Sequence, residues 1–115
     1  MNTIRIEILK TVVFDELQPY CSGRIGPCPC FREGQVFQTA YEKPEGFCDW
    51  AWHDIHPHVT AFMTGGNFSD GIFEGWMKDR NTMIACCTDG ARPVVFEIRK
   101  LEKQAGAEPP DSREA

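Results

Sequence analysis

The sequence contains no long hydrophobic run. No stretch approaches the roughly 18 apolar residues that a membrane-spanning helix requires. Charged residues also interrupt the N-terminal segment, at Arg5, Glu7 and Lys10, so a secretory signal would have no apolar segment there. We therefore expect no membrane association and a cytoplasmic location, in a compartment where thiols stay reduced.

Clusters of positive charge are also missing. The chain has 12 Lys and Arg against 17 Asp and Glu, which gives a formal net charge of −5. Nucleic-acid binding needs grouped basic side chains that neutralise phosphates, so we expect no nucleic-acid partner. The sequence likewise lacks a serine in a nucleophile elbow, and its glycine-containing stretch at 64–71 lacks the lysine of a phosphate-binding loop.

The composition is that of one small globular domain. The chain has 115 residues, of which 42% are hydrophobic and 25% charged, and this suits a single packed core. We expect one compact domain over residues 1–102. A disordered polar tail is expected over residues 103–115, where "KQAGAEPPDSREA" offers little apolar surface to bury.

Alternating apolar residues predict the strands. Ile4, Ile6 and Ile8 alternate with more polar neighbours, as in a half-buried strand over 3–14. The other strands are expected at 34–41 with Val36 and either Phe37 or Tyr41 inward, at 83–87, and at 93–101 with Val94, Phe96 and Ile98 on one face. The segment 72–79 is ambiguous between a strand and a helical turn. The expected fold class is α+β: a small, curved, mostly antiparallel sheet of about five strands with one main helix packed across it.

That helix is expected over residues 48–63. Trp52, Ile55, Val59 and Phe62 recur at helical spacing and form a stripe that should face the core. Pro57 lies inside this segment, so the helix is expected either to kink or to restart there.

Six cysteines carry the main chemical signal, although no paired C-x-x-C motif accompanies them. Cys28 and Cys30 are two residues apart, and Cys48 opens the helix, where first-turn N–H groups favour a thiolate. Thiolates from these three and from either Cys86 or Cys87 would select zinc or an iron–sulfur cluster. The alternatives are thiol redox or nucleophilic chemistry, and a structural role as small buried side chains.

Other side chains have both a structural and a functional interpretation. Trp50 lies off the helix stripe and is either a contact residue or, as we expect with Phe47 beside it, part of the core. Arg92 either holds an anionic ligand or pairs with Asp89, and we favour the pair. The histidines of "HDIHPH" are expected to be solvated surface residues rather than metal ligands; they are His53, His56 and His58.

Several of these segments together resemble a known family. They are "GPCP", "GQVF", "KPEGFCDWAW", "GGNF" and "CTDGARPVVFEI", and the resemblance covers residues 4–101. The family consists of small, uncharacterised, cysteine-containing prokaryotic proteins of about ninety residues, grouped as conserved hypothetical proteins. The resemblance implies a compact single domain and no established reaction. Cys28, Cys48 and Cys87 fall within its motifs, whereas Cys21 and Cys30 do not, and this favours a three-point site with Cys30 as a fourth candidate.

We therefore predict that Cys28, Cys48 and Cys87 converge near Trp50 and Arg92. Binding of zinc or an iron–sulfur cluster is preferred over thiol chemistry, because no general base stands beside a cysteine. For a reaction, the catalytic candidates are Cys48, Cys87 and Arg92, and the candidates for cofactor contacts are Trp50 and Arg92.

Strand alternation places Cys86 and Cys87 on opposite faces but does not say which thiol faces the core. Because the C-x-D-G motif of the resembling family starts at Cys87, the resemblance assigns Cys87 to the site and Cys86 to core packing. A rival hypothesis treats the cysteines as structural and the protein as a non-catalytic accessory or interaction subunit of a larger enzyme. Its partner would be another protein or a second copy of the chain. The sequence leaves the small-molecule ligand open.

Overall fold

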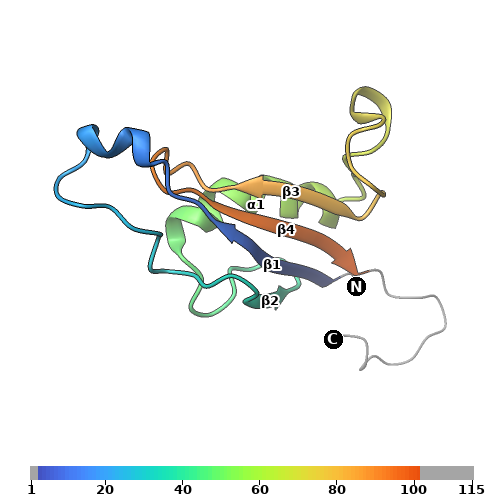
Figure 1. The fold of residues 1–115 in the computed structure, drawn as a ribbon. Helices are drawn as coiled ribbons and strands as arrows, with labels where there is room; N and C mark the ends of the chain where they lie inside the picture. Colours follow the sequence, from blue (N-terminus) through green and yellow to red (C-terminus); the bar gives the residue numbers. More distant parts are fainter. Residues whose placement is uncertain (1–2, 102–115) are drawn as a thin grey trace.

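The computed structural model describes residues 3–101 and has an α+β fold. Four strands, β1 (Thr3–Thr11), β2 (Val36–Thr39), β3 (Thr82–Cys86) and β4 (Val94–Leu101), form one antiparallel sheet in the order β2-β1-β4-β3. The main helix is α1 (Asp49–Met63), and short 3-10 helices lie at η1 (Asp15–Tyr20) and η2 (Gly71–Phe73), as Figure 1 shows.

The sheet has four strands and not about five. The ambiguous segment at 72–79 forms η2 and a loop. Gly71 and Gly75 there have φ values of +61° and +83°, in the left-handed region, and such residues interrupt an extended run. The other strands and the helix lie within one to three residues of their predicted bounds, except that β2 is shorter.

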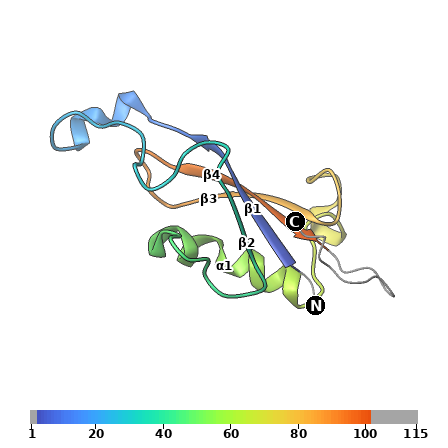
Figure 2. The same ribbon diagram turned by 90° about the horizontal axis from the view of Figure 1, so that it is seen from below.

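One face of the sheet packs against α1, as Figure 2 shows. Ile4, Ile6 and Ile8 of β1 are fully buried, which confirms the predicted alternation. The same face of β4 contributes Val94, Phe96 and Ile98, also buried, as predicted. At roughly 25 cal/mol per Å² of apolar surface, this single layer supplies most of the stabilisation of so small a domain.

The predicted stripe of α1 is confirmed in its main part. Ile55, Val59 and Phe62 have no exposed surface, whereas Trp52 is half-buried and Ala51 takes a place in the core. The helix continues through Pro57, which lies on its exposed side. In β2 the inward residue is Phe37, as one of the two alternatives predicted, whereas the inward placement of Val36 was wrong, since Val36 is 42% exposed.

None of the helices within residues 3–101 is long and apolar enough to cross a membrane. The predicted tail at 103–115 lies outside the described residues.

Candidate functional site

Buried Phe31 anchors the segment that carries Cys28 and Cys30. A turn at Pro29 and Cys30 leads into Phe31, whose ring centroid lies 5.0 Å from Phe47 and 5.4 Å from Phe96. Aromatic pairs at such distances stabilise the fold beyond the contribution of their buried apolar surface. Phe31 thus holds the adjacent Cys30 over the N-terminal end of α1, although Cys30 itself is exposed.

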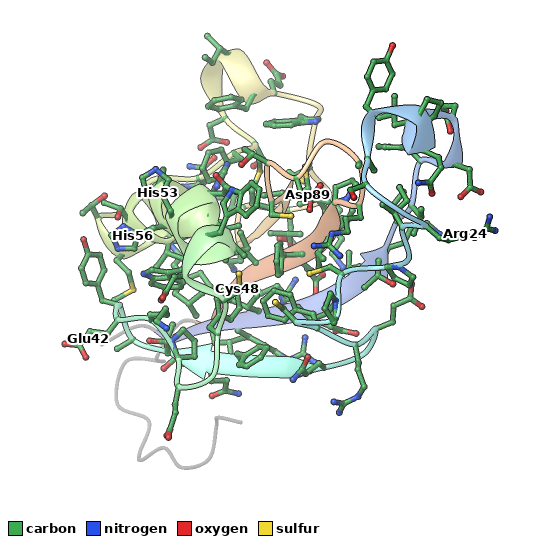
Figure 3. The ribbon with its side chains drawn as sticks, turned by 90° about the vertical axis from the view of Figure 1, so that its left-hand side faces the viewer. Arg24, Glu42, Cys48, His53, His56 and Asp89 are labelled. Carbon is green, nitrogen blue, oxygen red and sulfur yellow. The ribbon has the colours of Figure 1, made fainter. Side chains whose placement is uncertain are left out.

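Cys48 occupies the N-cap position of α1. Its backbone is extended, its carbonyl accepts the first helical hydrogen bond from Trp52 N–H at 2.9 Å, and its thiol makes no capping hydrogen bond. The preceding residue, Phe47, is buried and its backbone carbonyl accepts a hydrogen bond from Lys43 Nζ. Figure 3 shows Cys48 at this end of the helix. The thiol therefore stays available for other partners.

Cys28, Cys30 and Cys48 come together at this point. The pKa of the Cys30 thiol is raised to about 11, first by local burial of the thiol and then by hydrogen bonding and charge interaction with Cys28 and Cys48. Cys30 is exposed as a residue, but its sulfur lies against two other thiols that are half-buried. Because burial of the thiol, and after it the two neighbouring thiols, disfavours the charged form, Cys30 keeps its proton at neutral pH.

Cys87 makes a different contact. Its backbone N–H donates to the carbonyl of Val94 at 3.1 Å, and its Sγ accepts a hydrogen bond from Val94 N–H at 3.4 Å. The thiol is half-buried against the core and closes the connection between β3 and β4. Its convergence with Cys28 and Cys48 stays a prediction.

The assignment of Cys86 to core packing was wrong. Cys86 is exposed and lies on the other face of the sheet, while Cys87 packs against the core. The pKa of Cys86 is raised, first by partial burial of the Cys86 thiol and then by charge interaction with Cys87 and Asp54. Strand alternation correctly predicts opposite faces for the two thiols, but it does not say which face is covered.

Trp50 is 54% exposed and does not belong to the core, contrary to expectation. Its Nε1 donates to Thr88 Oγ1 at 2.7 Å, and Thr88 in turn donates from its N–H and its hydroxyl to Asp54. Sequence reasoning missed Thr88 and Asp54, because the contact joins residues from distant parts of the chain.

Arg92 pairs with Asp89, as predicted. Its Nε lies 3.1 Å from Asp89 Oδ2, and the backbone N–H groups of Ala91 and Arg92 donate to Oδ1. Partial burial acts to raise the pKa of Asp89, but these hydrogen bonds and the guanidinium outweigh it and hold the pKa below its usual value. The pair orders the turn between β3 and β4.

The histidines are spread along α1. His53 is exposed, and His56 packs between Tyr41 and Trp52 at centroid distances of 4.9 and 5.1 Å. Figure 3 shows both on the outer side of α1, away from Cys48. His58 lies against Phe68 with its Nδ1 buried, so the expectation of a solvated surface residue was wrong for His58, and burial lowers its pKa.

The donor geometry does not favour a metal centre. Three thiols are suitable ligands for zinc or an iron–sulfur cluster, but within residues 3–101 no group of three or more His, Cys, Asp and Glu side chains is arranged so that it could hold a metal ion. The metal centre therefore stays a prediction.

Comparison of the chain with family models, with curated proteins and with solved structures gave no match. The resemblance to the small prokaryotic family stays a prediction, and a functional proposal rests on the thiol geometry.

Proposed function

We propose that Cys28, Cys30 and Cys48 form a thiol–disulfide exchange centre in which Cys30 and Cys48 are reversibly oxidised. One observation carries the proposal: Cys30 interacts with thiols from both its own loop and the start of α1. Pro29 restricts the backbone between Cys28 and Cys30, which disfavours a disulfide between those two. Cys30 and Cys48 come from two separate segments, and they are therefore the better candidates for the disulfide.

The attacking group is Cys48 at the start of α1, which reacts as the thiolate after its thiol proton passes to solvent. It attacks one sulfur of a substrate disulfide, the S–S bond breaks, and the first substrate thiol leaves with a proton. Cys30 then gives up its proton and attacks the Cys48 sulfur, which releases the second thiol. Two electrons pass from the cysteine pair to the substrate, and the protein retains a Cys30–Cys48 disulfide.

The roles of the three thiols follow from their contacts. When Cys48 reacts as a thiolate, the neutral Cys30 thiol that interacts with it donates a hydrogen bond to that anion. Cys28 is half-buried against the core and interacts with the Cys30 thiol. Phe31 and Phe47, both buried, hold the two segments in place.

Peptide mapping after oxidation tests this function. The reduced full chain is treated with oxidised glutathione, alkylated and digested without reduction. A Cys30–Cys48 cross-link is expected, together with release of two equivalents of reduced glutathione. Cys30→Ser should leave a stable mixed disulfide at Cys48, and Cys86→Ser should behave as the wild type does. Mixed disulfides alone in the wild type, or a cross-link elsewhere, would overturn the proposal.

Exposed aromatic and aliphatic side chains favour a second candidate, an interaction subunit with structural cysteines. Trp50 and Trp76 are 54% and 52% exposed, and Ile72 is 92% exposed. Such residues are typical of contact hot spots. Under this alternative, Trp76→Ala would abolish association with the partner enzyme, and Cys30→Ser and Cys48→Ser would leave the activity of that complex unchanged.

A further inference from the structure

The face of the sheet opposite α1 carries two rows of like charge across β1 and β4. Arg5 of β1 lies directly opposite Arg99 of β4, and Glu7 lies directly opposite Glu97. α1 packs on the other face, and among the described residues no helix or further strand covers this one (Figure 2). The face is therefore a basic row beside an acidic row, two residues apart along the strands.

This arrangement is unfavourable within a single chain. Like charges directly opposite on neighbouring strands destabilise a sheet. Arg5 compensates in part, since its guanidinium lies 3.0 Å from Glu7 and 3.7 Å from Glu97. Arg99 reaches outside the rows to Asp79, at 3.6 Å. Each row nevertheless keeps one sign, so the face has a fixed alternation of charge.

We propose that this face packs against the same face of a second copy of the chain. A two-fold axis that runs across the strands, between the rows, places each acidic row on the basic row of the other subunit. Glu97 then faces Arg99 of the partner subunit, and Glu7 faces Arg5 of the partner subunit. Such an isologous contact is the commonest interface of homodimers.

The same axis matches apolar residues. Val95 lies two positions from Glu97 along β4, and Leu101 lies two positions beyond Arg99, so Val95 of one subunit meets Leu101 of the partner subunit. Ile84 and Val36, at 36% and 42% exposure, border the acidic row on β3 and β2. They add apolar surface at both edges of the contact.

The charge pattern favours a second copy of the chain over other partners. The four charges of the two rows sum to zero, and Lys10, opposite Val95, adds one cation beyond the acidic row. This alternation of sign fits a self-complementary surface and offers little to a uniformly charged ligand such as a nucleic acid. Four strands about 4.8 Å apart, with a rise of about 3.3 Å per residue, bury roughly 1,000 Å² in total when two copies stack. Because this is the lower limit for a specific interface, the dimer should be weak.

Sedimentation equilibrium of the full chain tests the proposal, over a range from about 10 µM to about 1 mM that covers a weak dimer. The wild type should show a monomer–dimer equilibrium that added salt weakens. Glu97→Arg and Arg99→Glu should each be monomeric, since each places like charges opposite each other across the interface. Glu16→Arg and Arg24→Glu change exposed residues away from the face by the same charge, and both should dimerise as the wild type does.

Mixing the two monomeric variants gives the decisive result. Glu97→Arg has basic side chains at both of these β4 positions, and Arg99→Glu has acidic side chains at both, so an equimolar mixture should form a heterodimer. The double variant that carries both changes should dimerise by itself. Circular dichroism confirms that each variant is folded. A wild type that stays monomeric throughout, a dimer that neither variant weakens, or a mixture without heterodimer would overturn the proposal.

Discussion

The indole Nε1 of Trp50 donates a 2.7 Å hydrogen bond to the hydroxyl of Thr88, which ties the first turn of α1 to the segment after β3. Asp54, one helical turn further along α1, accepts hydrogen bonds from the N–H of Thr88 at 2.7 Å and from its hydroxyl at 3.0 Å. Thr88 is thus held between two side chains of the helix. This contact explains how Trp50 has a defined position without burial.

Thr88→Val should destabilise the protein by about 1 kcal/mol. The substitution removes the hydroxyl that accepts from Trp50 and donates to Asp54, and a hydrogen bond contributes about this much net. Urea unfolding gives the free energy, and tryptophan emission should change as the indole is released. Thr88→Ser keeps the hydroxyl and should resemble the wild type. Equal stability of all three proteins would show that the contact contributes nothing.

Phe62→Ala should destabilise the protein far more, by about 3–5 kcal/mol. Phe62 is fully buried between α1 and the sheet, and its truncation leaves a cavity. Thermal unfolding followed by circular dichroism measures the loss. Ile72→Ala is the control, because Ile72 is 92% exposed and little should change. Unfolding of Phe62→Ala at the wild-type temperature would contradict the packing of α1.

Cys30 should react slowly with iodoacetamide near neutral pH despite its exposure. Its pKa of about 11 leaves little thiolate, and the rate should rise about tenfold per pH unit up to that value. Cys48→Ala removes one neighbouring thiol, so the pKa should fall and Cys30 should react faster at pH 8. Mass spectrometry of the alkylated peptides measures both rates. Cys86→Ala should leave the Cys30 rate unchanged, and equal rates in all three proteins would exclude coupling of the thiols.

Acid should weaken the fold below about pH 6.5, the ordinary pKa of histidine. Burial lowers the pKa of His58 in the folded protein, so the unfolded chain binds the proton more readily. This contribution to stability is complete above the unfolded pKa and is lost as pH falls from there toward the lowered folded pKa. Thermal unfolding between pH 7 and pH 5 should show a steeper decline for the wild type than for His58→Gln. The exposed His53 provides the control, since His53→Gln should keep the wild-type slope.

Local patterns predict much of the fold. The alternation of Ile4, Ile6 and Ile8 and the stripe of Ile55, Val59 and Phe62 both mark buried faces, because side-chain direction along one strand or helix depends only on neighbouring residues. The predictions fail where burial depends on another element. Neighbours in sequence place Trp50 and Val36 inward, and the family resemblance places Cys86 inward, but each of the three is exposed.

The candidate site shows the same division. The spacing of Cys28 and Cys30 and the position of Cys48 at a helix start mark them as candidates, but the sequence favours Cys87 over Cys30 as the third thiol. Packing of Phe31 against Phe47 is what carries Cys30 to Cys48. No pattern within either segment predicts the contact between Phe31 and Phe47, since the two segments meet only through the shared core.

The sequence by itself determined where the helix and strands lie and which of their faces are apolar, because these follow from side-chain periodicity along a short stretch of chain. Only the tertiary structure decided which thiols meet and which charges oppose each other. The pairing of β1 with β4 sets Arg5 opposite Arg99 and Glu7 opposite Glu97, and a shift of one residue would turn these side chains to the other face. That register is chosen by burial of Ile6 against Ile98 under α1, a contact between the two ends of the chain.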